Sequence, residues 1–179
     1  ANPTERPQGG TSRRLGGCQS IKSVYIPSSM VAIGSNAFCG CKSLESVFFS
    51  NGLSTIGYNA FMNCNNLASV DLPFTLKSIG GSAFEGCGGI EAIHLPNSLT
   101  TIEAAAFAYC SGLSSITIPN GIDSIKGGNQ IGVFEGCSNL ASLTIGKDVK
   151  VIERRAFANC KKHLRERQCL QFLFLRQYS

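Results

Sequence analysis

The sequence predicts a right-handed solenoid of the α/β class, with a parallel β-sheet and with short helical turns or irregular segments elsewhere. The evidence is a cysteine that recurs along the chain, with a phenylalanine three residues before it in every unit but the first. Five of the six cysteine intervals are 23 residues and one is 27. The columns comprise Cys18, Cys41, Cys64, Cys87, Cys110, Cys137 and Cys160, and Phe38, Phe61, Phe84, Phe107, Phe134 and Phe157. A unit of this length cannot bury its apolar face alone, so the copies must stack.

The apolar residues between the cysteines predict the elements of each unit, which reads C-x-x-L-x-x-V-x-I-P-x-x-L-x-x-I-x-x-x-A-F-x-x-C. The V-x-I pair is spaced as on one face of a strand. A proline such as Pro27 or Pro73 then ends that strand, because proline cannot donate to a ladder. A second extended segment carries the next two aliphatic residues. The Ala-Phe pair is expected in a short helical turn, for which Ser35 and Ser82 are the candidate caps.

These residues and their spacing resemble the BspA-like leucine-rich repeats, in particular the treponemal subtype, whose 23-residue unit ends in A-F-x-x-C. The resemblance covers about residues 14–160. It implies a leucine-rich-repeat arc with its parallel sheet on the concave side. It also implies a secreted, periplasmic or cell-surface location and a role in adhesion or host-protein binding, because members of this class are commonly surface-exposed or secreted.

One repeat domain is expected over residues 14–160. Residues 1–13 are rich in proline, glycine and polar residues and are expected to be poorly ordered. The four-residue insertion near 127–132 is expected to bulge from the convex or lateral surface. After Cys160 the pattern fails, although Leu170, Leu173 and Leu175 restore the leucine spacing seven residues late. Residues 161–179 are therefore expected to form an irregular basic and apolar tail, a displaced seventh strand or a cap over the open end, unless they do not continue the repeat at all.

Composition and charge exclude several classes of protein. With 43% hydrophobic and 15% charged residues, the chain is too apolar and too weakly charged to be disordered. No apolar run approaches the roughly 20 residues needed to span a bilayer, so an integral membrane protein is not expected. Residues 147–179 carry nine basic and three acidic residues, whereas residues 18–146 carry four basic and seven acidic ones. Nucleic-acid binding is not expected, because the predicted concave columns contain no basic residue.

The nine cysteines are interpreted as structural residues rather than as a metal site or a disulfide framework. Seven of them occupy the repeat column, where a stack of small buried side chains is expected. Cys39 and Cys169 lie outside that column, and Cys39-Gly40-Cys41 lacks the second half of a metal motif. No metal and no cofactor is expected, because the glycines recur with the repeat and serve turns rather than a phosphate-binding loop.

One column of residues is the candidate partner-binding site. Seven residues after each cysteine, the first strand is expected to point a side chain from the concave sheet into solvent. This column comprises Tyr25, Phe48, Asp71, His94, Thr117 and Thr144. It stands above a flat floor, because the outward column five residues after each cysteine contains only serine and alanine. The aromatic pair at its N-terminal end is a favoured kind of anchor for a protein partner, unless the N-terminal segment folds over the pair as a cap.

The row of Asp71, His94 and Thr117 carries a weaker hypothesis. On consecutive strands, an acid, an imidazole and a hydroxyl would superficially resemble a nucleophilic triad. The favoured interpretation is an ordinary cross-strand polar ladder, because a flat sheet does not exclude water and no oxyanion loop is visible. A metal at Asp71 and His94 would lack a third ligand, since Glu91 belongs to a different strand edge. The chain is therefore predicted not to be an enzyme.

The sequence thus predicts a non-enzymatic protein-interaction module, and the resemblance suggests a host or extracellular-matrix protein as its partner. The alternative is binding of a small hydrophobic ligand near an imperfectly capped end. The apolar residues at that end are Phe172, Leu173, Phe174 and Leu175. An exposed strand there would also permit weak self-association between two copies of the chain.

Overall fold

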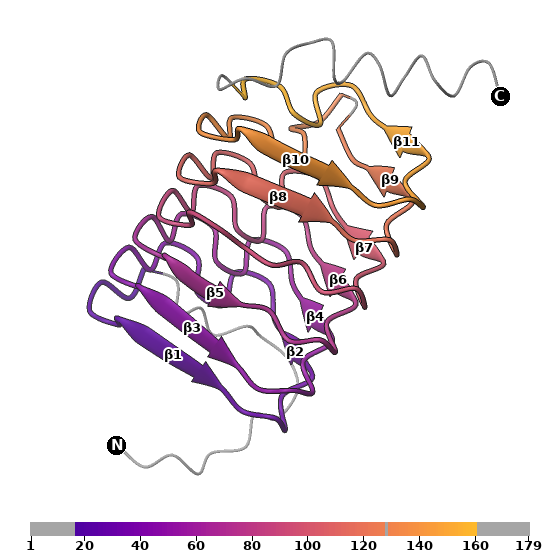
Figure 1. Cartoon of the computed structure of the whole chain (residues 1–179). Coiled ribbons are helices and arrows are strands. Elements are labelled where there is room, and N and C mark those ends of the chain that lie inside the picture. The colour runs from indigo at the N-terminus through magenta and orange to yellow at the C-terminus, as the bar shows by residue number, and fades with distance from the viewer. Residues whose placement is uncertain (1–16, 128, 161–179) are drawn as a thin grey trace, which may run out of the picture.

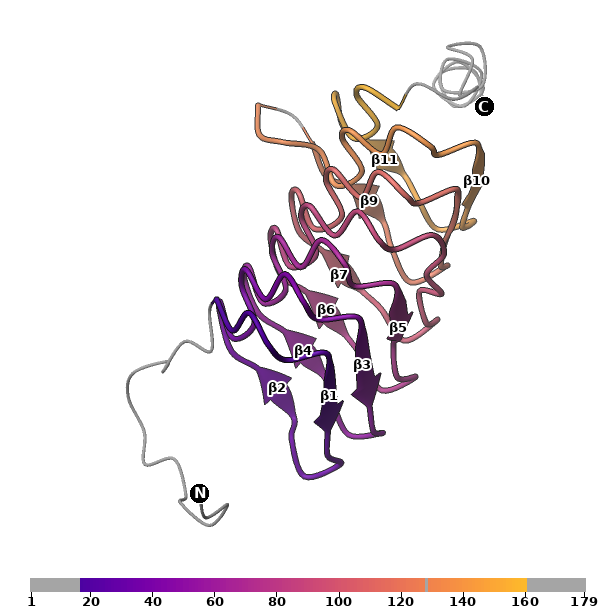
Figure 2. The same cartoon turned by 90° about the vertical axis from the view of Figure 1, so that its left-hand side faces the viewer.

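Each repeat unit forms one coil, which in all but the fourth unit contains a front strand, a back strand and a run of tight turns. The computed structural model describes residues 17–127 and 129–160, which comprise six coils that each begin at a repeat cysteine. The coils stack in one direction, with the front and back strands on different sides (Figures 1 and 2). The front strands are β1 (Ser23–Ile26), β3 (Ser46–Phe49), β5 (Ser69–Asp71), β8 (Ser115–Ile118) and β10 (Ser142–Ile145). The back strands are β2 (Ala32–Ile33), β4 (Thr55–Ile56), β6 (Ser78–Ile79), β7 (Thr101–Ile102), β9 (Ser124–Ile125) and β11 (Val151–Ile152).

Neighbouring coils pair in parallel and in register with the repeat. Val24 lies opposite Val47, and Val47 lies opposite Val70, so each residue faces its equivalent in the next unit. The register survives the insertion, because Thr117 pairs with Thr144 across the one 27-residue unit. The predicted parallel stacking of the coils is therefore confirmed.

The core consists of the same layer repeated from coil to coil. The rings of the phenylalanine column stack with centroids 5.2–5.6 Å apart and interplanar angles of 3–8°. Phe61, Phe84, Phe107 and Phe134 are fully buried in this stack. Aliphatic columns fill the rest of each layer, and one of them comprises Leu44, Leu67, Ile90, Leu113 and Leu140, none of which is exposed. Because burial of each such side chain contributes about 1.5–3 kcal/mol, these columns dominate the stabilisation of the fold.

The Ala-Phe segments form successive tight turns, so the prediction of helical turns and of an α/β class is wrong. No helix occurs within residues 17–127 and 129–160, and the fold is a parallel β-solenoid. The amide of Met62 donates to the carbonyl of Asn59, three residues back, whereas the amide of Phe61 donates to Ala83 of the next coil at 2.8 Å. Alternate amides therefore bond between coils and are not available to a helix. A segment this short also nucleates a helix poorly.

Residues with a left-handed backbone recur at two fixed places in the turn runs. One place directly precedes the cysteine and is occupied by glycine in several coils. The other lies five residues before the cysteine, where φ is between 53° and 59° at Asn36, Asn59, Ser82 and Ala105. Ser82 therefore occupies a left-handed turn position and does not cap a helix. Glycine and asparagine tolerate this conformation best, which explains why they recur in the turn runs.

The front face is interrupted at the fourth coil, which the repeat pattern does not predict. β1, β3 and β5 form one sheet, and β8 and β10 form another. Between them, the fourth coil contributes only an isolated bridge from Ala92 to Ser115, and His94 lies outside the strands. Asp71 and Thr117 consequently belong to separate sheets. The expectation that Asp71, His94 and Thr117 form a row on consecutive strands is therefore wrong.

The described residues of the insertion, 127 and 129–132, follow β9 and project beside the turn runs, on a side of the stack that neither the front strands nor the back strands occupy (Figure 2). The predicted N-terminal segment, residues 1–13, and the predicted tail, residues 161–179, lie outside the described residues. The apolar patch Phe172 to Leu175 lies outside them as well. In the part of the chain that the structure describes, no helix is long and apolar enough to cross a membrane.

Candidate functional site

The front column comprises the six candidate residues, and every one of them is exposed. The cause is the strand alternation, which is clearest on β8, where Ile116 and Ile118 are buried while Ser115 and Thr117 face solvent. The same alternation exposes the serine floor beside the column. The exposed members of the front column are Tyr25, Phe48, Asp71, His94, Thr117 and Thr144.

Tyr25 and Phe48 form an aromatic pair in direct register on β1 and β3. Their exposed fractions are 69% and 52%, which are high values for large apolar side chains on a sheet. The Tyr25 hydroxyl hydrogen-bonds to the Ser50 hydroxyl, with 2.7 Å between the oxygens, so the ring is held across the neighbouring strand. A side chain that is already held in place loses less entropy when a partner covers it.

The polar members of the front column act as separate surface groups. Within the described residues, the side chains of Asp71, His94 and Thr117 make no hydrogen bond to one another, and the break at the fourth coil separates their strands. Among the same residues, no group of three or more histidine, cysteine, aspartate or glutamate side chains is placed to hold a metal ion. The arrangement offers polar contacts to a partner and assembles no catalytic unit.

Three further exposed aromatic side chains were missed by the sequence analysis. Phe74, Tyr58 and Tyr109 are 68%, 56% and 45% exposed. Phe74 follows β5 on the turn between the two faces, and the two tyrosines belong to the turn runs. Each interrupts a column that otherwise holds mainly small or polar residues, so comparison of the outward columns could have found all three.

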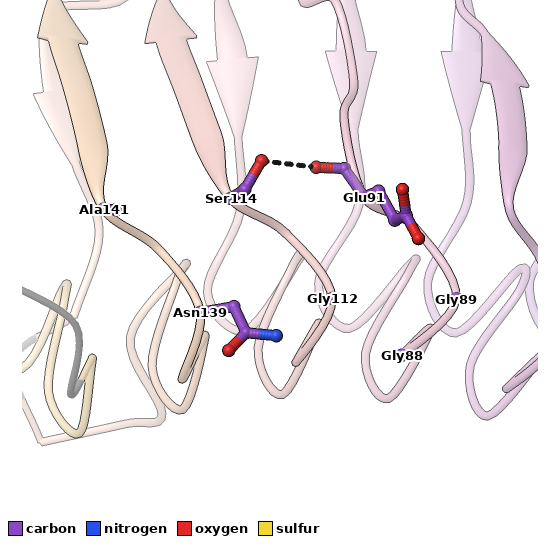
Figure 3. A pocket seen from close by; sticks show the side chains of 7 residues that line it. All are labelled: Gly88, Gly89, Glu91, Gly112, Ser114, Asn139 and Ala141. Carbon is purple, nitrogen blue, oxygen red and sulfur yellow. Dashed lines mark hydrogen bonds between the residues drawn. The ribbon is translucent and has the colours of Figure 1, made fainter.

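A shallow groove crosses the fourth, fifth and sixth coils where the chain approaches the front strands (Figure 3). Its floor is made of glycine, since a Cβ atom on Gly112 would lie 2.5 Å from the carbonyl oxygen of Gly88. The side chains of Glu91 and Asn139 lie on either side of this floor. The Ser114 hydroxyl donates to the Glu91 carbonyl at 3.2 Å. The groove therefore adds a carboxylate and an amide beside the front face, at the fourth to the sixth coil.

The repeat cysteines inside the stack are buried thiols, as expected. Burial raises the pKa of Cys64 and of Cys137 to about 12 and raises the pKa of Cys87 and of Cys110 well above the ordinary value. A nucleophile or a metal ligand must be a thiolate, so these residues are unsuited to either role. Their function lies in the packing of the stack.

The comparisons with known proteins agree with this geometry. A family model described as the BspA type leucine-rich repeat region matches residues 12–129 in six copies. A leucine-rich-repeat protein from T. pallidum is 33% identical, with a TM-score of 0.80, over 88% of this chain and 72% of that protein. One from Bacteroides ovatus is 35% identical, with a TM-score of 0.74, over 80% of this chain and 36% of that protein. No curated protein matches the chain.

A third structure, from Eubacterium ventriosum, is 20% identical with a TM-score of 0.63 and shares the fold. The match covers 83% of this chain and 45% of the Eubacterium ventriosum protein. Leucine-rich-repeat solenoids generally mediate protein interactions and are typically non-enzymatic. The exposed front column and the absence of an assembled catalytic unit in the described residues are consistent with that use of the fold.

Proposed function

Because the chain belongs to the BspA-type leucine-rich-repeat family, we propose that it is a non-enzymatic module that binds a protein partner through the front column. The observation that carries this proposal is the aromatic pair Tyr25 and Phe48, exposed side by side above a floor of serine. Aromatic side chains bury a large area at little entropic expense, which is why they dominate the binding energy of protein interfaces.

The charges beside the pair indicate the kind of surface that would complement it. Lys22 and Glu45 neutralise each other across adjacent coils, with 3.3 Å between the Nζ and Oε1 atoms. Asp71 and Glu91 are exposed and form no ion pair within the described residues. A complementary partner presents an apolar centre to Tyr25 and Phe48 and hydrogen-bond donors or basic groups toward Asp71 and Glu91.

We further propose that the partner is a host or extracellular-matrix protein and that the chain acts at a cell surface or after secretion. The support is membership of a family whose bacterial relatives are commonly surface-exposed or secreted. A rigid solenoid with an extended binding face suits adhesion, because many modest contacts along it add up while the backbone stays fixed.

The test is capture by the immobilised chain from a mixture of serum and extracellular-matrix proteins, followed by titration of each captured protein in purified form. Replacing both aromatic anchors, Tyr25→Ala with Phe48→Ala, removes side chains of the hot-spot type. We expect affinity for the partner to fall at least about thirtyfold, because such anchors each contribute roughly 2 kcal/mol.

The matched control is Tyr109→Asn, which removes an exposed aromatic side chain from a turn run. Asn63 and Asn159 occupy the equivalent place in other coils with the same left-handed backbone, so this variant should fold normally. Capture should be unchanged in the control and weakened in the double variant, with circular dichroism showing that both keep the native fold. Equal binding by the folded double variant would disprove the assignment of the front column.

A further inference from the structure

A second groove lies beside the insertion, on the side of the solenoid formed by the turn runs. Residues from the second to the fifth coil line it, among them Tyr58, Gly81, Glu103, Ala104, Gln130 and Ile131. Tyr58 and Gly81 come from consecutive coils, and Gln130 and Ile131 come from the insertion. The groove therefore lies where the exposed ring of Tyr58 approaches the insertion of the fifth coil.

The insertion wall is anchored by a buried carboxylate. Glu135 is 2% exposed; its Oε2 accepts the amide of Gly132 at 3.0 Å and its Oε1 accepts the Arg155 guanidinium at 2.7 Å. The carbonyl of Ile131 accepts the amide of Ala105 at 3.1 Å, which continues the bonding between coils. These contacts hold the insertion in place beside the fourth coil, so it forms a built wall of the groove.

The opposite wall is the ring of Tyr58, which is 56% exposed. The ring lies against Gly81, since a Cβ atom there would be 3.3 Å from the ring carbon Cδ2 and 3.3 Å from the Ala104 carbonyl oxygen. Glycine at this place therefore leaves an open floor next to the ring.

The charge of the groove is one-sided. Glu103 is exposed, and no basic side chain is among the residues that line the groove. Within the described residues, neither Glu103 nor Tyr58 makes an ion pair or a side-chain hydrogen bond. An exposed aromatic ring and a carboxylate without a counter-ion in one groove are the chemistry that attracts a cation, through the ring quadrupole and through Coulomb attraction.

We propose that this groove binds a cationic side chain, arginine or lysine, of a protein partner. The ring of Tyr58 covers the apolar stem and the charged head, and the Glu103 carboxylate pairs with the charge. The site lies on a different side of the coil from the front column. It is argued from separate residues, so it does not depend on the function proposed for that column.

The test uses the full chain and a small probe, the peptide acetyl-Gly-Arg-Gly-amide, titrated in nitrogen-15 correlated NMR spectra. The matched probe contains citrulline, which keeps the shape of arginine and lacks its charge. We expect the arginine peptide to shift the amide signals of Gly81, Ala104 and Gln130. The citrulline peptide should bind several-fold more weakly.

Two variants separate the contributions of the ring and the carboxylate. Tyr58→Ser places the residue found at the equivalent position of the first coil, Ser35, and Glu103→Gln removes only the charge. Each should weaken binding of the arginine peptide about two- to fivefold, the range expected for an exposed cation–π contact or ion pair. Tyr109→Asn, which changes an exposed tyrosine outside the groove, should leave the affinity unchanged.

The proposal is overturned if the arginine peptide causes no shifts or shifts signals away from the groove. It is also overturned if the citrulline peptide binds equally well, or if a Glu103→Gln variant with an otherwise native spectrum binds as tightly as the wild type. Weaker binding in both variants with an unchanged control supports it.

Discussion

The thiol of Cys110 donates a hydrogen bond to the carbonyl oxygen of Phe84, which lies 26 residues earlier in the chain, with 3.2 Å between sulfur and oxygen. The bond repeats along the solenoid, so each repeat cysteine from the third coil onward reaches back to a phenylalanine carbonyl. The other pairs are Cys64 with Phe38, Cys87 with Phe61, Cys137 with Phe107 and Cys160 with Phe134. Cysteine therefore recurs as a small buried residue that also satisfies a carbonyl between coils.

The buried thiols should resist alkylation in the folded protein. At pH 8, iodoacetamide should leave Cys87 and Cys110 unmodified, because both are fully buried and burial raises their pKa well above the ordinary value. Cys39 is partly exposed and serves as the accessible control in the same chain. Peptide mass spectrometry after a short reaction gives the modification of each cysteine. All of them should react in guanidinium, and rapid labelling of Cys110 in the native state would contradict the buried column.

The same thiols should make the fold less stable at high pH. The pKa of Cys64 is 9.0 in its ordinary state and about 12 in the folded protein. Between those values the unfolded chain releases the proton while the folded chain keeps it, so ionisation favours unfolding. The stabilisation is complete below pH 9 and is lost progressively as pH rises toward about 12. Urea denaturation at pH 8, 9.5 and 10.5 should show this loss, with a shallower pH dependence in Cys64→Ala than in the wild type.

The ion pair between Arg155 and Glu135 should protect the fold against acid. The hydrogen bond that the Glu135 carboxylate accepts from Arg155 lowers the pKa of Glu135 below the ordinary 4.5. Burial of the carboxylate opposes this change. The unfolded chain takes up the proton first as pH falls, so the stabilisation is present above pH 4.5 and is lost through the lower pKa of the folded state. In Arg155→Asn, the pKa of Glu135 should rise and acid unfolding, followed by circular dichroism, should begin at higher pH.

Asparagine is the appropriate replacement for Arg155, because residue 155 has φ of 72° and asparagine already holds the equivalent place at Asn36 and Asn59. Arg154→Ala is the matched control, since Arg154 donates to Asn129 and not to Glu135. If the control shifts acid unfolding as much as Arg155→Asn does, the protection does not come from the ion pair.

The two floor glycines Gly112 and Gly88 of the groove in Figure 3 should differ in how much an alanine substitution destabilises the fold. In Gly112→Ala the new methyl group would lie 2.5 Å from the Gly88 carbonyl oxygen and 3.0 Å from that of Ile90, both fixed backbone atoms. In Gly88→Ala the only close atom is the mobile hydroxyl of Ser111 at 3.0 Å. Overpacking should lower the free energy of unfolding of Gly112→Ala by about 1–3 kcal/mol, measured by urea denaturation, and leave Gly88→Ala within about 0.5 kcal/mol of the wild type.

Much of the fold is readable from the repeat because one pattern is copied six times. Phe84 and Phe107 stack because both occupy the same place in their units, and Val24 pairs with Val47 for the same reason. The exposure of Tyr25 and Phe48 follows equally from strand alternation. The exposed ring of Tyr58 and its approach to Gln130 did not follow, because they lie 72 residues apart in chain numbering and meet only through an irregular coil.

The sequence by itself determined the coil: its period, its strands and the columns that fill its core, because an apolar side chain at a fixed place in every unit has nowhere to go but the interior of the stack. Only the tertiary structure decided which carbonyl accepts a backbone amide that could bond either within its own coil or to the next coil. Phe61 and its equivalents donate to the next coil, so the Ala-Phe segments are successive tight turns rather than helices. Ala92 retains only a bridge to Ser115, so the front face is divided at His94. Side-chain periodicity does not report that choice, since it depends on how closely two neighbouring backbones approach.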